Sequence, residues 1–208
     1  MNPPSKIVCV GRNYAEHARE LGNTLPPEPL LFLKPPSALI GDGDAIVLPR
    51  ASERVEHEGE IAVVVGKRMK RVSETEAVEG IAGLACANDV TARDLQRKDG
   101  QWTRAKGFDT FCPLGPRVVP LRELPPLDQL EIICRVNGEV RQRGRSGEMA
   151  FPIPALLSYI SRIMTLEPGD IVLTGTPSGV GPLVAGDVVE VEIPGVGVLR
   201  NPVVAGDL

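Results

Sequence analysis

Residues 55–66, VEHEGEIAVVVG, restrict the fold of this chain more than any other stretch, because alternating acidic residues run directly into an unbroken apolar run. Side chains two apart on a β-strand point to the same face, so Glu58 and Glu60 should lie together at the mouth of an apolar strand. Two close carboxylates repel each other, and a hard divalent cation between them would relieve that repulsion. The alternative is an acidic strand end in solvent, and this stretch alone leaves both readings open.

Composition supports a small, turn-rich protein. Twenty Pro and 22 Gly among 208 residues predict many turns and few long helices. A net charge of −4 without a basic cluster argues against a nucleic-acid partner. No segment approaches the roughly 20 apolar residues of a membrane span, and the first ten residues do not read as a secretory signal. We therefore expect one domain, residues 1–208, that is cytoplasmic and has no membrane partner.

The cysteines and histidines argue against zinc. The four Cys are far apart and form no CxxC pair, which favours buried reduced thiols. Only two His, His17 and His57, are available as further ligands.

A short helix is expected over residues 14–21, YAEHAREL, with Gly22 ending it. His17 and Glu20 are three residues apart and so share a helical face, where the carboxylate would orient the imidazole and make it a stronger base. An incidental pair on an exposed helix is the alternative. The proline-rich stretch 24–29 follows, and the segment 13–29 as a whole could act as a mobile flap.

Other local patterns predict the remaining framework. Asn137-Gly138 lies between two strand-like runs and predicts a hairpin over residues 130–142. Residues 73–80 read as a helix with a Ser73–Glu76 capping box, and residues 154–164 read as the longest helix. Further short strands are expected at residues 6–10, 30–33, 45–48, 171–173 and 188–193, and the apolar run 81–87 fits either a buried strand or the end of a helix.

Three more segments carry candidate site residues. If residues 89–96, DVTARDLQ, are helical, Asp89, Arg93 and Gln96 fall on one face. The alternatives are an N-cap role for Asp89 and a surface ion pair between Asp89 and Arg93. Lys106 lies in a polar segment, where a lysine is more often solvated than catalytic. The loop 174–179, TGTPSG, is rich in backbone donors that suit a carboxylate, although a plain β-turn is the alternative.

Several segments, taken in this order, resemble the fumarylacetoacetate hydrolase superfamily. Most are weak alone, but the ordered set is specific and covers most of the chain. The resemblance is to compact bacterial members that consist of the catalytic domain alone. The matching segments are GRNYAEHARE, LFLKPPSALIGDGD, HEGEIAVVVGK, ANDVTARDLQ, QWTRAKGFDTFCPLGP, VNGEVRQ and GDIVLTGTPSGVGP.

This resemblance implies a mixed, mostly β fold, a rolled β-sandwich with a few short helices, and a homodimer. It implies that a magnesium ion, or manganese or calcium, is bound by three carboxylates. That favours metal binding by the acidic strand and Asp89 over the alternatives given above, and a catalytic role for the His17–Glu20 pair. Arg93 could still be structural. The implied metal ligands are Glu58, Glu60 and Asp89, the implied catalytic residues are His17, Glu20 and Lys106, and the implied substrate-binding residues are Arg93, Gln96, Gly175 and Thr176.

The resemblance also implies a metal-dependent enzyme that acts on a small 2-oxo acid or dioate through an enolate. Of the activities in this superfamily, the segments EVEIPGVGVLRNPVV and ANDVTARDLQ favour 2-hydroxyhepta-2,4-diene-1,7-dioate isomerase / 5-carboxymethyl-2-oxo-hex-3-ene-1,7-dioate decarboxylase, of aromatic catabolism, because they look like members given that name. The alternatives are an acylpyruvate or fumarylpyruvate hydrolase, an oxaloacetate decarboxylase, and a metal- and carboxylate-binding protein without turnover. An intact His17–Glu20 pair favours the hydrolase or oxaloacetate decarboxylase.

Overall fold

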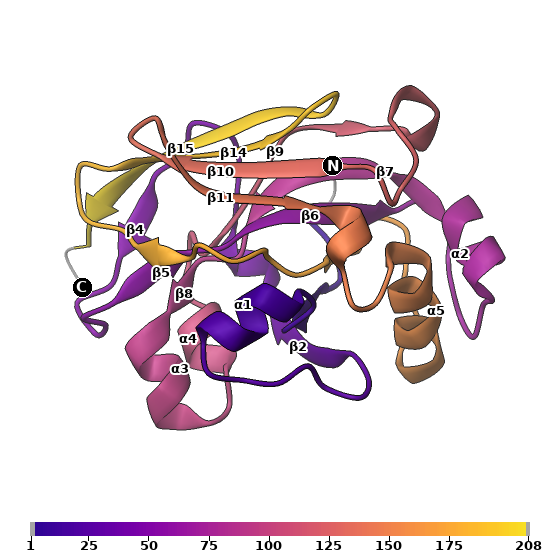
Figure 1. Ribbon diagram of the computed structural model, residues 1–208, viewed down its shortest axis with the longest axis horizontal. Helices are drawn as coiled ribbons and strands as arrows, with labels where there is room; N and C mark the ends of the chain where they lie inside the picture. Colours follow the sequence, from indigo (N-terminus) through magenta and orange to yellow (C-terminus); the bar gives the residue numbers. More distant parts are fainter. Residues whose placement is uncertain (1–2, 207–208) are drawn as a thin grey trace.

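Three β-sheets form the framework of the computed structural model, which describes residues 3–206 (Figure 1). The seven-stranded sheet has the order β2-β1-β12-β6-β7-β9-β3, with strands β1 (Ile7–Gly11), β2 (Leu30–Lys34), β3 (Leu39–Ile40), β6 (Gly59–Val65), β7 (Ile81–Asn88), β9 (Cys112–Val119) and β12 (Ile171–Leu173). The five-stranded sheet has the order β11-β10-β14-β15-β4, with strands β4 (Ile46–Leu48), β10 (Glu131–Val136), β11 (Glu139–Arg145), β14 (Val188–Ile193) and β15 (Gly197–Ala205). The three-stranded sheet joins β13 (Gly181–Pro182), β5 (Val55–His57) and β8 (Thr91–Ala92).

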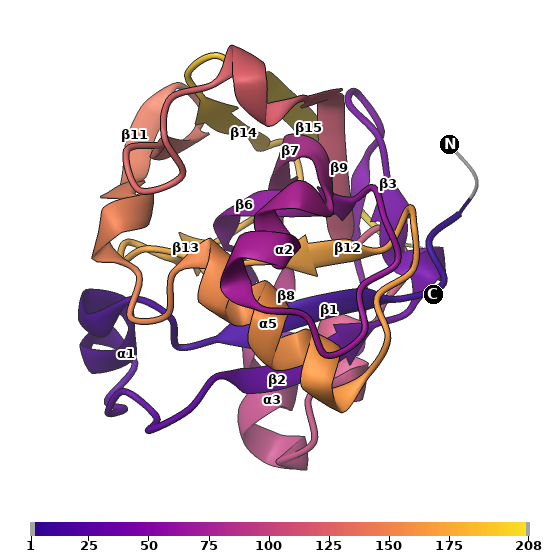
Figure 2. The same cartoon turned by 90° about the vertical axis from the view of Figure 1, so that its right-hand side faces the viewer.

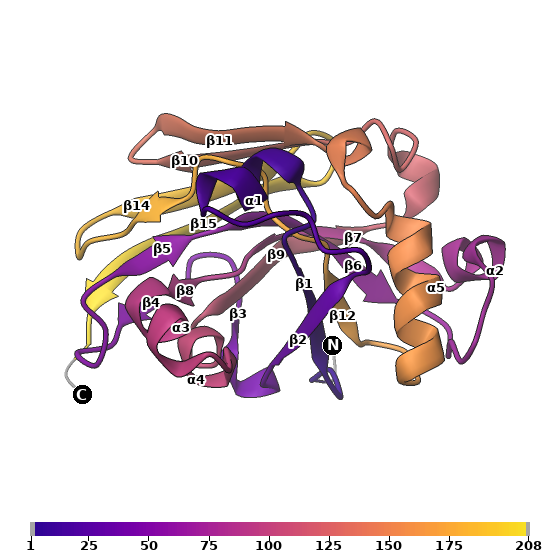
Figure 3. The ribbon, with the colours of Figure 1, turned by 60° about the horizontal axis from the view of Figure 1, so that its bottom comes forward.

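Short helices cover the ends of this β-structure. They are α1 (Ala15–Glu20), α2 (Glu74–Glu79), α3 (Arg93–Asp99), α4 (Thr103–Lys106) and α5 (Ile153–Ile163). Helices α2 and α5 lie together at one end, whereas α3 and α4 lie together towards the other (Figures 1 and 3). Within residues 3–206, no helix has the length and apolarity needed to cross a membrane.

Strand β6 runs through the middle of the molecule, which explains its unbroken apolar sequence. Ile61, Val63 and Val65 belong to the larger apolar core, which also contains Val191 of the five-stranded sheet. Ala62, on the opposite face, belongs to a second apolar cluster. Both faces of β6 are therefore buried between layers, and Figure 2 shows the sheets curling around this core. The expected mostly β, rolled sandwich with few short helices is confirmed.

In the seven-stranded sheet, the ends of four neighbouring strands bring candidate site residues together on one side. Strand β1 is parallel to β12, β12 is antiparallel to β6, and β6 is antiparallel to β7. Consequently the carboxyl ends of β1, β12 and β7 lie beside the amino end of β6. Glu60 begins β6, and Asp89 directly follows β7. Residues far apart in the sequence meet there for this reason.

The helix expected over residues 89–96 starts later than its pattern suggested. Thr91 and Ala92 form β8, which pairs with Val55 and Glu56 of β5, so helix α3 begins at Arg93. The N-cap position is occupied by Ala92, so an N-cap role for Asp89 is wrong. The pairing with β5 overrides local helix propensity because it links segments about 35 residues apart, which no local pattern contains.

Candidate functional site

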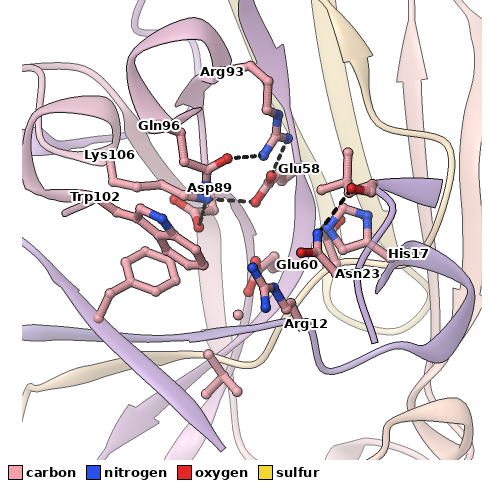
Figure 4. A pocket seen from close by; sticks show the side chains of 15 residues that line it. Arg12, His17, Asn23, Glu58, Glu60, Asp89, Arg93, Gln96, Trp102 and Lys106 are labelled. Atoms are coloured by element: carbon pink, nitrogen blue, oxygen red, sulfur yellow. Dashed lines mark hydrogen bonds and ion pairs between the residues drawn. The ribbon is translucent and has the colours of Figure 1, made fainter. Parts of the chain in front are cut away.

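Three buried carboxylates meet at the edge where the four strands end (Figure 4). Glu58, Glu60 and Asp89 each offer an oxygen atom, and these atoms all lie within 4.8 Å of one another. The residues are only 4%, 2% and 1% exposed, so the solvated strand end considered above is wrong. Oxygen donors of this kind suit magnesium, manganese or calcium, and the donor set therefore fits a divalent ion of that class.

Three cationic side chains surround these carboxylates. Lys106 donates to Glu58 Oε2 at 2.8 Å and to Asp89 Oδ2 at 2.6 Å. Lys34, at the end of β2, donates to Asp89 Oδ1 at 2.6 Å. Arg93 forms ion pairs with Glu58 and Glu56 and is only 2% exposed. Each of these buried charges thus has a partner of opposite sign, as the low dielectric constant of the interior requires.

The three carboxylates are not equally compensated. Burial raises the pKa of Glu58, but the cations of Lys106 and Arg93 outweigh burial and hold that pKa well below its ordinary value. Burial also raises the pKa of Glu60, and the negative charges of Asp89 and Glu58 raise it further. The hydrogen bond that Glu60 Oε2 accepts from the Gly175 N–H, 2.6 Å, offsets only part of this effect. Of the two glutamates, Glu60 is therefore the one whose negative charge is least compensated, and an added cation beside it would be most favourable.

Helix α3 contributes Arg93 and Gln96, one turn apart. Arg93 Nη1 donates to Gln96 Oε1 at 2.7 Å, and both residues line the cavity. The expected surface ion pair between Arg93 and Asp89 is wrong, because the guanidinium is buried against Glu56 and Glu58 instead. Because its oxygen is already an acceptor, the Gln96 amide keeps its N–H groups for a ligand.

Helix α1 brings His17 to the cavity, on the opposite side of the carboxylates from Lys106 and Trp102 (Figure 4). The His17 Nδ1–H donates to Glu20 Oε2 at 3.4 Å, which leaves Nε2 with the free lone pair. Glu20 also accepts the Gly179 N–H at 3.0 and 3.2 Å, so the same carboxylate fastens α1 to the loop after β12. His17 is 5% exposed, unlike a residue on an incidental surface helix. The mobility of residues 13–29 stays a prediction.

The loop after β12 uses its polar groups mainly on the protein itself. The Gly175 N–H binds Glu60, as described above, and the Thr176 hydroxyl donates to the Gly59 carbonyl at 2.8 Å. Gln142 donates to the oxygen of that hydroxyl at 2.7 Å. Thr176 also lines the cavity. The loop therefore fixes the carboxylate-bearing start of β6, whatever else it binds.

Of the ten residues expected in the site, all except Glu20 and Gly175 line this cavity, and those two contact His17 and Glu60 directly. Sequence reasoning missed Lys34, Arg12 and Trp102. Arg12 and Trp102 line the cavity, whereas Lys34 lies behind Asp89. The space open to a water-sized sphere is about 60 Å³, several times the ~10–15 Å³ that one water needs.

Known proteins are similar to this chain in sequence and in fold. Residues 6–204 match the family described as "Fumarylacetoacetate (FAA) hydrolase C-terminal". Mitochondrial oxaloacetate tautomerase FAHD1 of Bos taurus is 47% identical over 194 residues, which cover 91% of this chain and 87% of the tautomerase. Crystallised 5-carboxymethyl-2-hydroxymuconate delta-isomerase of Mycobacterium smegmatis is 48% identical with a TM-score of 0.91, covering 99% of this chain and 81% of that one. The structure of 2-hydroxyhepta-2,4-diene-1,7-dioate isomerase of Mycobacterium marinum is 47% identical with a TM-score of 0.90, covering 99% and 77%.

Proposed function

Because this chain belongs to the fumarylacetoacetate hydrolase family, we propose that it isomerises a small 2-oxo dicarboxylic acid between its keto and enol forms with the help of a divalent metal ion. The three relatives described above support this choice, since each is named for a tautomerase or isomerase reaction on a small organic acid. The observation that carries the proposal is that three buried carboxylates and an oriented histidine face one cavity.

Glu58, Glu60 and Asp89 would hold the ion, which we take to be magnesium or manganese. When bound, such an ion supplies positive charge that stabilises negative charge on the substrate's keto oxygen. Gly175 and Thr176 keep the start of β6 in place for this purpose, through the hydrogen bonds to Glu60 and to the Gly59 carbonyl.

We assign proton transfer to His17. Its Nε2 has the free lone pair because Nδ1–H is donated to Glu20, and the ring faces the cavity from α1. A neutral imidazole so oriented can take a proton from the carbon next to the keto group and return it to oxygen or to another carbon. Glu20 stabilises the imidazolium that forms in between.

Positive and amide side chains in the cavity support the proposal of a substrate with two carboxylates. Arg12 and Lys106 line the cavity, and Gln96 presents amide N–H groups to it. Arg93 is paired with Glu56 and Glu58, and Lys106 with Glu58 and Asp89. We therefore assign the substrate carboxylates to Arg12 and Gln96, and to Lys106 once it has given up its two protein carboxylates. A dianionic substrate would match the two added charges of the ion.

A panel of 2-oxo acids tests the reaction type. The protein is incubated in D₂O with oxaloacetate, an unsaturated dioate or a 2-oxo monoacid, with magnesium or with chelator, and proton NMR follows both exchange and fragments. Isomerisation predicts magnesium-dependent deuterium exchange next to the keto group without carbon–carbon cleavage. Fragments would instead support hydrolysis or decarboxylation, for which the room for water in the cavity that His17 lines is the favouring observation. Neither exchange nor fragments would support binding without turnover.

Two substitutions test the proposed metal site and the proposed general base separately. We expect Glu58→Ala to lose magnesium binding and turnover together, because one of three ligands is gone. We expect His17→Ala to lose turnover at least about hundredfold while keeping magnesium affinity, because general-base catalysis is typically worth that much. Titration calorimetry and the exchange assay measure the two effects. Arg19→Gln, on the exposed face of α1, is the control that should resemble the wild type. Full activity of Glu58→Ala in chelator would refute the proposed metal site.

A further inference from the structure

Two buried lysines hold the two oxygen atoms of one carboxylate. Lys34 Nζ lies 2.6 Å from Asp89 Oδ1, and Lys106 Nζ lies 2.6 Å from Asp89 Oδ2. Their side chains are 0% and 2% exposed. The two lysines have the same charge and lie at the same distance from the same carboxylate. They differ only in their other contacts, which therefore indicate the role of each.

The remaining contacts of Lys34 anchor it behind the site. Its ammonium also donates to the backbone carbonyl of Val90 at 3.1 Å. Lys34 ends strand β2 and is not among the residues that line the cavity. It thus holds Asp89 from outside the cavity that Glu58 and Glu60 line, with a second bond to backbone that keeps the ammonium in place.

The remaining contacts of Lys106 place it inside the site. Its ammonium bridges Asp89 to Glu58 Oε2, 2.8 Å away, and the residue lines the cavity. The positive charge therefore sits between two of the three carboxylates whose oxygen atoms converge. The ammonium also lies 4.9 Å from the centre of the Phe32 ring, and that ring packs edge-on against Trp102 at 5.1 Å.

We propose that Lys106 takes the place of a divalent ion in the metal-free protein and gives up Glu58 and Asp89 when the ion binds, whereas Lys34 is a positioning residue that keeps Asp89 oriented in both states. This inference rests on the metal site of the proposed function. An ammonium and a divalent cation cannot share the same pair of carboxylate oxygens without strong repulsion, because the interior screens charge poorly. Lys34 approaches from behind and keeps its bonds.

Release of Lys106 would link metal loading to substrate binding. In the structure its ammonium is paired with two protein carboxylates. Once released it remains beside the cavity on the short helix α4, where it is free to bind a substrate carboxylate. The cavity would therefore gain a substrate-binding cation only when the ion is present.

Calorimetric titration with magnesium, without substrate, compares the wild type with Lys106→Met and Lys34→Met. Lys106→Met removes the competing cation, so we expect magnesium to bind at least about tenfold more tightly although turnover is lost. Lys34→Met frees Asp89 to rotate, so we expect weaker binding than in the wild type. Both variants remove one buried positive charge from the same carboxylate. Equal tightening in both would mean a general charge effect and would overturn the inference.

The fluorescence of Trp102, the only tryptophan in the chain, gives a second readout that does not depend on Lys34→Met being folded. Movement of the Lys106 ammonium changes the charge beside Phe32 and Trp102, so magnesium should shift the emission of the wild type. Lys106→Met should bind magnesium without that shift. The same shift in Lys106→Met, or unchanged affinity, would refute the inference. Absence of any magnesium binding to the wild type would instead refute the proposed metal site itself.

Discussion

Gln142 ties together two of the segments that build the site, although it does not line the cavity. Its Oε1 accepts the N–H of Gly59, the first residue of β6, which lies between Glu58 and Glu60, at 2.9 Å. Its amide nitrogen donates to Thr176 Oγ1 and to the Pro177 carbonyl, both at 2.7 Å. The side chain is 1% exposed, so water cannot replace these bonds when they are lost.

We expect Gln142→Leu to lower the free energy of unfolding by roughly 2–4 kcal/mol, because the Gly59 N–H and the Pro177 carbonyl would be buried without partners. Magnesium affinity should fall as well, since the start of β6 loses an anchor. Urea unfolding and calorimetry measure the two quantities. Gln129→Leu makes the same change at an exposed position and should stay within about 0.5 kcal/mol of the wild type. Equal losses in the two variants would contradict this role for Gln142.

Residues such as Gln142 and Lys34 lay beyond sequence reasoning for a physical reason. Lys34 is 55 positions from Asp89, and Gln142 is 83 positions from Gly59. Their roles arise only when distant strands pair, and a lysine or glutamine beside a strand normally indicates exposure. The alternating glutamates and the His17–Glu20 spacing were readable because strand and helix periodicity places those pairs locally.

Helices and turns were predicted correctly where contacts between residues close in the sequence determine them. The Ser73–Glu76 capping box is present at the start of α2, and Asn137 and Gly138 adopt the positive φ angles, 53° and 80°, of the expected hairpin turn. The start of α3 was misplaced because long-range pairing with β5 takes residues 91–92. Local hydrogen bonding is visible in a sequence, whereas the partner of an edge strand is not.

The start of β12 is held by one carboxylate. Asp170 Oδ1 accepts from the Ser5 N–H at 3.0 Å and the Ser5 hydroxyl at 2.7 Å. Its other oxygen accepts the Glu167 N–H at 2.8 Å and forms an ion pair with Lys6. Burial raises the pKa of Asp170, but these donors outweigh burial and leave that pKa below its ordinary value. The segment before β1 is thereby fixed to β12, its parallel neighbour.

Because the pKa of Asp170 is lowered in the folded protein, the free energy of unfolding depends on pH in the acidic range. The folded-state pKa lies below the unfolded value of about 3.9, so Asp170 contributes stability above that pH and loses it as pH falls through the folded value. We expect Asp170→Asn to lose roughly 1–3 kcal/mol near neutral pH, with the deficit shrinking below about pH 4. Urea unfolding across a pH series measures the difference. Asp128→Asn, at an exposed position, serves as control. A deficit that stays constant with pH would contradict this account.

At the scale of the whole molecule, the fold carries a conflict between its core and its site. Strand β6 passes through the apolar core at Ile61 and Val63, yet the same strand starts with a carboxylate that is 2% exposed. That carboxylate, Glu60, lies against two others, and burial with their repulsion raises its pKa. Such an arrangement is costly to folding, and the proposed metal site would explain why the chain has it.

We expect Glu60→Gln to be more stable than the wild type in chelator, because glutamine is neutral and can still accept the Gly175 N–H. The folded-state pKa of Glu60 is raised, so its charging costs stability as pH rises from the ordinary value of about 4.3 towards the folded value. The advantage of the variant should therefore grow with pH over that range. Magnesium should reverse the ranking, since binding stabilises the wild type by about 2.7 kcal/mol at one hundred times its dissociation constant. Thermal unfolding across a pH series, with chelator or with magnesium, measures both effects. If the variant is less stable than the wild type in chelator at every pH, Glu60 stabilises the fold itself and is not a cost that ion binding offsets.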